Sequence, residues 1–203
     1  MVRSKTYTPK IIQNPNKTEE GHFIVDICGD EYQMCINSSG NFWANEKEGG
    51  EWDPGLISVE GDEHKPVRTG LLVEVAFAKL FGVPVNFEYS FGGVANDFSF
   101  GNLTVDTKCA RYNYGAGLIR AEDEWGRKTP LVSDVYAFGY IIEEDRVNLK
   151  VQVALVGSIP KEDVEGYPIK KARKGKHKNY DIPYKELIPI QKWWERKDDF
   201  LNL

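Results

Sequence analysis

Apolar residues recur with two different periods along this chain, and the period changes at residue 69. From Leu71 to Leu80 they recur every three or four positions, which predicts a buried amphipathic helix. We expect Thr69 to cap the N-terminus of this helix, and Gly82 followed by Pro84 to end it.

Short apolar or alternating runs bounded by turn residues predict the strands. The strands are expected at residues 22–28, 31–37, 41–44, 83–87, 98–109, 134–142 and 147–157. The first three form a predicted β-meander, with turns at Gly29-Asp30 and at residues 38–40.

The order of these elements predicts an α/β (α+β) fold, with a central mixed sheet flanked by helices. We expect two parts: an N-terminal appendage over residues 1–66, made of the β-meander and an acidic loop, and a main domain over residues 67–203. A last helix, beginning near Pro183 or Pro189, carries two tryptophans. Residues without periodicity are expected to be loops, at 45–66, 111–130 and 170–178.

Length and composition exclude several classes of protein. At 203 residues the chain has the size of one domain and can bury a substantial core. No apolar run approaches the ~20 residues that cross a bilayer, and no signal sequence is evident, so we expect a cytoplasmic protein with no membrane partner. Three cysteines are too few for a disulfide framework, which indicates reduced thiols.

The most informative segment lies around the predicted hairpin at residues 98–109. If Gly101-Asn102 forms its two-residue turn, Asp97 lies opposite Asp106, and Lys108 shares their face two residues further on. Carboxylates placed across a ladder have Cβ atoms ~5 Å apart and repel each other, so we expect a hard cation to compensate them. The structural alternative is a solvated hairpin face with a Lys–Asp pair.

A third carboxylate, Glu74, interrupts the apolar surface of the predicted helix at residues 71–80. A buried acid is costly unless it is paired or bound to a cation, so Glu74 is a candidate partner of the hairpin carboxylates. The alternative is a position at the solvent edge of the helix, because Glu is a good helix former.

Glu74 on a helix, then Asp97, then Asp106 and Lys108 in an Asp-x-Lys motif together resemble the PD-(D/E)XK nuclease superfamily. The resemblance covers about residues 69–157, and Asn96 stands where the family name has proline. It implies a restriction-endonuclease-like core and an enzyme, a metal-dependent endonuclease or exonuclease that hydrolyses phosphodiester bonds of DNA.

The same resemblance implies a role for each site residue. Asp97, Asp106 and the backbone carbonyl of Thr107 would bind Mg²⁺, or Mn²⁺ in its place, and Glu74 would complete the metal site. Lys108 would position and activate the attacking water, leaving a 5′-phosphate and a 3′-hydroxyl. The implied partner is duplex or branched DNA, a homodimer would cut two strands, and the small size favours a phage or mobile-element protein acting in the host cytoplasm.

Basic residues outside the motif are candidates for binding nucleic acid, although the net charge of the chain is −5. Residues 170–178 carry six Lys or Arg side chains in nine positions, which indicates a phosphate-binding surface that works by counterion release. A solvated basic loop is the alternative interpretation. The predicted nucleic-acid-binding residues are Arg111, Arg120, Lys170, Lys171, Arg173, Lys174, Lys176 and Lys178.

A second function class stays open. Residues 19–63 hold 12 acidic residues and one basic residue, so the charge is unevenly distributed. This pattern is also compatible with a non-catalytic nucleic-acid-binding or assembly protein that has a nuclease-like fold, and metal binding would separate the two hypotheses.

Overall fold

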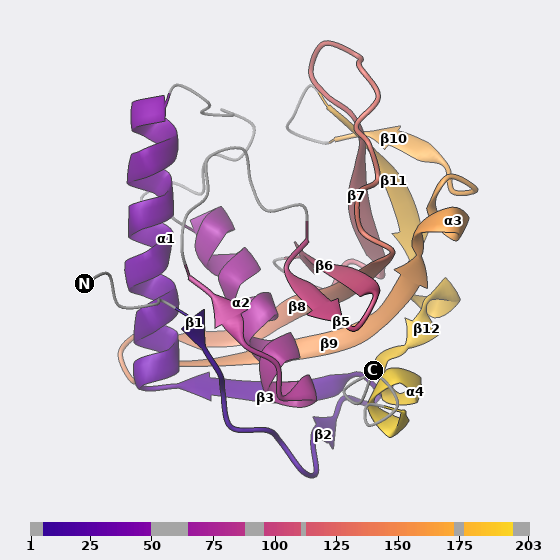
Figure 1. The fold of residues 1–203 in the computed structure, drawn as a ribbon. Coiled ribbons are helices and arrows are strands. Elements are labelled where there is room, and N and C mark those ends of the chain that lie inside the picture. The colour runs from indigo at the N-terminus through magenta and orange to yellow at the C-terminus, as the bar shows by residue number, and fades with distance from the viewer. Residues whose placement is uncertain (1–5, 50–64, 88–95, 111–112, 173–176, 197–203) are drawn as a thin grey trace.

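The computed structural model describes residues 6–49, 65–87, 96–110, 113–172 and 177–196, and Figure 1 shows their arrangement. The strands are β1 (Thr6–Tyr7), β2 (Asn16–Lys17), β3 (Phe23–Cys28), β4 (Val85–Asn86), β5 (Phe98–Phe100), β6 (Leu103–Ala110), β7 (Ala116–Glu122), β8 (Val135–Asp145), β9 (Lys150–Pro160), β10 (Ile169–Lys171), β11 (Lys178–Pro183) and β12 (Ile188–Pro189). The helices are α1 (Asp30–Gly49), α2 (Lys65–Phe81), α3 (Lys161–Val164) and α4 (Ile190–Glu195), with a 3-10 turn at Tyr184–Glu186.

The main sheet is mixed, as the sequence predicts. Its strand order is β2-β3-β9-β8-β6-β5, and β12 also pairs with β9. β6 and β8 run parallel, whereas β5–β6, β8–β9, β3–β9 and β2–β3 are antiparallel. The fold is therefore α+β, with the hairpin that carries the candidate site at one end of this sheet.

Two hydrophobic clusters cover the opposite faces of the main sheet. Alternate side chains of β8 divide between them: Ala137 belongs to the cluster with α1, α2 and β3, whereas Phe138 belongs to the cluster with β7 and β11. A second sheet, of order β10-β11-β7, thus packs on the face that α1 and α2 leave free, and in Figure 1 it rises away from the main sheet.

The predicted β-meander is wrong beyond its first strand. β3 forms as predicted, but residues 30–49 are the helix α1. This helix replaces the second and third predicted strands and the first part of the predicted loop at 45–66. Gly29 has a φ of +58° and its carbonyl accepts the amide of Gln33, which starts the helix. Tyr32, Cys35 and Ser39 are buried at helical spacing, and this packing overrides the turn-like residues at 38–40.

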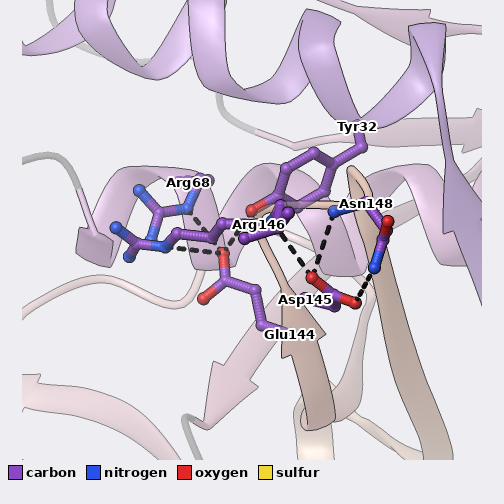
Figure 2. Close-up of polar contacts among 7 residues, drawn as sticks. Tyr32, Arg68, Glu144, Asp145, Arg146 and Asn148 are labelled. Atoms are coloured by element: carbon purple, nitrogen blue, oxygen red, sulfur yellow. Dashed lines mark hydrogen bonds and ion pairs between the residues drawn. The ribbon is translucent and has the colours of Figure 1, made fainter.

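Residues before 67 share the sheet and the core with the rest of the chain. β3 pairs with β9 along its whole length, and α1 packs beside α2. A buried ion network reinforces this contact, since the Glu144 carboxylate on β8 accepts a hydrogen bond from Tyr32 of α1 at 2.8 Å and from Arg68 of α2 at 3.0 Å (Figure 2). Arg146 adds an ion pair at 3.8 Å to the same oxygen.

The other predicted loops also contain strands. Residues 111–130 include β7, and the two flanks of the basic run at 170–178 are β10 and β11. One of the glycines that favour a loop, Gly117, has a packing role instead, because a Cβ on it would lie 2.3 Å from the Phe138 ring.

The hairpin and the end of the long helix are as predicted. Phe98 pairs with Val105 and Phe100 with Leu103 around the Gly101-Asn102 turn. α2 ends at Phe81, followed by Gly82 with a φ of +72°. It begins earlier than predicted, at Lys65, so Thr69 is buried within the helix and is not its N-cap. Among the described residues, no helix is both long and apolar enough to cross a membrane.

Candidate active site

Four predicted site residues come together where α2 lies against the β5–β6 hairpin. Glu74 projects from α2, Asp97 immediately precedes β5, and Asp106 and Lys108 lie on β6. The charges of Asp97, Asp106 and Lys108 all act on the Glu74 carboxyl, so residues separated by up to 34 positions form one electrostatic cluster. α2 is held there by apolar packing, including a stacked contact between Phe77 and Phe98 at 5.0 Å.

Asp97 is fixed by one neighbouring residue. Its Oδ2 atom accepts a hydrogen bond from the backbone N–H of Thr107 and another from the Thr107 hydroxyl, both at 2.7 Å. The Asp97 carboxylate thus accepts the backbone hydrogen bond of Thr107 that a carbonyl of a neighbouring strand would otherwise accept. Two short hydrogen bonds to one oxygen orient the carboxylate and leave its second oxygen for other partners.

Asp106 and Lys108 form an ion pair, with Lys108 Nζ 2.6 Å from Asp106 Oδ2. The Asp106 side chain is 16% exposed and that of Lys108 is 34% exposed, so the lysine is the more accessible partner. The ammonium group also lies 5.9 Å from the centre of the Tyr136 ring, close enough for a cation–π interaction. Lys108 is therefore held at the border between the carboxylates and solvent.

Two carboxyl groups of the cluster, those of Glu74 and Asp106, are destabilised in their charged form. Desolvation raises the pKa of Glu74 well above its usual value, and the negative charges of Asp97 and Asp106 raise it further. Desolvation also raises the pKa of Asp106 to about 6; Lys108 opposes this shift, whereas Asp97 adds to it. Concentrated negative charge with too little compensation is typical of catalytic and metal-binding clusters.

The donor set fits a hard divalent cation in its chemistry. Carboxylate and carbonyl oxygens are the ligands that Mg²⁺ and Mn²⁺ prefer. Among the residues that the structure describes, no three His, Cys, Asp or Glu side chains already converge as a ligand group. One oxygen of Asp106 is bonded to Lys108, and one oxygen of Asp97 is bonded to Thr107.

The predicted nucleic-acid-binding residues only partly meet this site. Arg120 lies on β7, opposite Asn179 of β11, and Asn179 lies opposite Lys170 of β10, so Arg120 and Lys170 share one face of the second sheet. Lys170 is ion-paired with Asp181, and Lys178 with Glu122 at 2.6 Å. Lys171 is exposed. Arg111, Arg173, Lys174 and Lys176 lie outside the described residues.

A pocket beside Lys108 was not anticipated from the sequence. It has a volume of about 400 Å³ and lies between the end of β6 and the second sheet, where Leu118 of β7 and Asp181 of β11 form part of its wall. Tyr114 and Tyr184 also line it. These residues were missed because they fall in segments predicted as loops or left unassigned, and only the pairing of β7 with β11 brings them together.

Comparison of the chain with protein-family models, with curated proteins and with solved structures finds no match in any of the three. Functional inference therefore depends on the geometry of the cluster and of the pocket beside it.

Proposed function

We propose that this protein is a metal-dependent nuclease that hydrolyses phosphodiester bonds of DNA. The observation that carries the proposal is the 2.6 Å ion pair of Asp106 and Lys108 on β6, with the Asp97 carboxylate beside it. The charges of these three side chains reach the Glu74 carboxyl on α2. We further propose that α2, β5 and β6, together with β8 and β9, form a restriction-endonuclease-like core. The order of helix, hairpin and later strands supports this assignment.

Glu74, Asp97, Asp106 and the backbone carbonyl of Thr107 would hold Mg²⁺ or Mn²⁺. When bound, the cation supplies Lewis-acid chemistry, polarising the phosphate and favouring deprotonation of the attacking water. The strongly desolvated environment of Glu74 supports this role, because a cation would relieve a charge repulsion that the folded chain otherwise retains.

Lys108 orients the attacking water and stabilises the negative charge that develops on the phosphate. Asp106 anchors the lysine through their 2.6 Å ion pair, and Tyr136 supports its ammonium group from the side. In the reaction, the water oxygen forms a bond to phosphorus and the bond from phosphorus to the 3′ oxygen breaks. The attacking water releases a proton to solvent and the 3′ oxygen takes one from solvent, giving a 5′-phosphate and a 3′-hydroxyl.

DNA is the proposed partner, engaged through the second sheet. Arg120 and Lys170 lie on a face whose other residues, Leu118 and Asp181, reach the pocket beside Lys108. The ion pairs of Lys170 and Lys178 with acidic side chains lower the net positive charge of this surface, so phosphates would have to exchange with these acids. The three unpaired thiols support a cytoplasmic location.

The test is cleavage of supercoiled plasmid and linear duplex with Mg²⁺, with Mn²⁺ and with EDTA. We expect cleavage with either metal and none with EDTA. Lys108→Met should abolish cleavage while keeping Mg²⁺ or Mn²⁺ binding by calorimetry, whereas Asp106→Asn should abolish both.

The matched control is Lys128→Met, which removes an exposed lysine that is paired with Glu165 and is not among the charges acting on Glu74 or Asp106. If Lys108→Met, Asp106→Asn and Lys128→Met cleave as the unmodified chain does, the catalytic assignment is wrong. DNA binding without cleavage and without metal binding would support the alternative, a non-catalytic nucleic-acid-binding protein.

A further inference from the structure

The pocket beside Lys108 is a second place where ligand chemistry converges. Side chains from both sheets line it, so it exists only in the folded chain: Lys108 and Phe138 come from the main sheet, and Leu118 and Asp181 from the second. Its volume of about 400 Å³ lies in the range of small-molecule sites. Lys108 belongs to both the pocket and the carboxylate cluster, so a ligand in the pocket lies directly beside the proposed scissile phosphate.

The rim of the pocket is apolar and exposed. Tyr114 is 69% exposed and Leu118 is 52% exposed, although both are large side chains that folding normally covers. Gly117, between them and the sheet, has no side chain because the Phe138 ring occupies that space. An exposed aromatic ring at the rim of a pocket provides a stacking surface for a flat ligand.

The pocket also contains polar groups. The Asp181 side chain is 19% exposed and is held by its ion pair with Lys170. Tyr184 also lines the pocket, and its hydroxyl is buried with no hydrogen-bond partner among the described residues. The Asp181 carboxylate repels phosphate and the two carbonyl oxygens that flank the N3–H of thymine, but it accepts a hydrogen bond from an exocyclic amino group. The Asp181 side of the pocket therefore disfavours the backbone of a nucleic acid and favours a base that carries such an amino group.

We propose that this pocket binds one unpaired nucleobase of the strand being cut, next to the scissile phosphate, and that it selects bases with an exocyclic amino group over thymine. This inference builds on the proposed nuclease function. Tyr114 stacks on the base, and Asp181 accepts a hydrogen bond from the amino group. The base must be unpaired, because its face and its pairing edge are both engaged. The favoured substrate is therefore single-stranded DNA or a duplex with a flipped or unpaired nucleotide.

The experiment measures binding by the full chain of fluorescently labelled ten-nucleotide strands of thymidine, with or without cytidine replacing the five central residues. The buffer contains Ca²⁺, a hard cation of the same ligand preference, in place of Mg²⁺. We expect the cytidine strand to bind at least fivefold more tightly, and Asp181→Leu, which removes the acceptor oxygens, to remove this preference. Tyr114→Ala should weaken both strands about tenfold, since stacking does not depend on the base.

Trp125→Ala is the matched control. Trp125 is also an exposed aromatic residue, at 71%, but it lies in the turn after β7 and does not line the pocket. This variant should bind as the unmodified chain does. Far-UV circular dichroism and the thermal midpoint of each variant verify that it is folded.

Equal affinity for the two strands, or a preference that persists in Asp181→Leu, would overturn the inference. If metal-dependent plasmid cleavage that requires Lys108 accompanies that result, the nuclease proposal stands and the base pocket alone fails. If cytidine preference is present but cleavage is absent with every metal, the pocket stands as a nucleotide site and the nuclease proposal fails.

Discussion

Asp97 and Thr107 are joined twice, because the backbone N–H and the hydroxyl of Thr107 both donate to the same carboxylate oxygen at 2.7 Å. Thr107 is the middle residue of the Asp-x-Lys motif. Its side chain donates to Asp97, which lies outside the motif. The middle position of this motif thus orients one proposed metal ligand, while its carbonyl is itself a second proposed ligand.

Thr107→Val tests this positioning role. It keeps the shape and strand preference of the side chain and removes only the hydroxyl, so Asp97 keeps one hydrogen bond and loses the other. We expect a loss of about 1–2 kcal/mol in Mg²⁺ binding, measured by calorimetry, together with slower cleavage. Thr107→Ser should restore both, and a valine variant with unchanged metal affinity would show that the hydroxyl has no positioning role.

Glu74→Gln should make the metal-free protein more stable. The carboxyl of Glu74 is desolvated and faces two further acids, so an uncharged side chain of the same shape removes repulsion. We expect about 1 kcal/mol of added stability in EDTA, measured by urea unfolding, and the loss of any stabilisation by Mg²⁺. Glu143→Gln, at an exposed position of β8, is the control and should change neither quantity. Lower stability of Glu74→Gln would contradict the electrostatic argument.

Stability should fall at alkaline pH through Tyr32. Burial, together with the hydrogen bond to Glu144, raises the pKa of this hydroxyl from 10.0 to about 12. Because the pKa of Tyr32 is higher in the folded than in the unfolded state, the protonated hydroxyl stabilises the fold. This stabilisation is complete below pH 10 and is lost as the pH rises from 10 toward 12.

Urea midpoints at pH 9 and pH 11 measure this effect. Tyr32→Phe should be less stable than the unmodified chain at pH 9 by about 1–3 kcal/mol, because Glu144 loses a buried donor, and its midpoint should fall less between the two pH values. Tyr114→Phe, at an exposed tyrosine, should show the full fall. An identical fall in all three proteins would rule out Tyr32 as the titrating group.

Two glycine substitutions should have opposite effects. Gly117→Ala places a methyl group 2.3 Å from the Phe138 ring, which should cost about 1–3 kcal/mol of stability and be partly relieved by Phe138→Leu. Gly70→Ala, inside α2 with nothing within 4 Å of the new methyl group, should add about 0.5–1 kcal/mol. Thermal unfolding of both variants checks the pair, and a stable Gly117→Ala would mean that the two sheets can separate without cost.

The local part of the site could be predicted from the sequence. Two turn residues, Gly101 and Asn102, fix the register of the hairpin, which pairs Phe98 with Val105. The next residue on each strand, Asp97 and Asp106, then bring their side chains close to each other. The period of the apolar residues in α2 is strong enough to identify Glu74 as an acid in an apolar setting. These inferences succeed because they depend on contacts close in sequence or on one regular helix.

The parts that could not be predicted depend on distant contacts. α1 contains Ser38-Ser39-Gly40, a typical turn sequence, and forms a helix because Tyr32 and Cys35 pack into the shared core. β7 begins among glycines and becomes a strand only through its pairing with β11, more than 50 residues later. The pocket beside Lys108 follows from that pairing, so no local pattern could reveal it.

The central position of β8 and β9 has a consequence for how the molecule opens. Both strands have neighbours on either side within the main sheet, and hydrophobic clusters cover both of their faces. Their amide hydrogens should therefore exchange with solvent only through global unfolding, whereas the short β5 at the end of the sheet exchanges through a much smaller opening. The β5–β6 hairpin can thus open locally while the middle of the sheet stays closed.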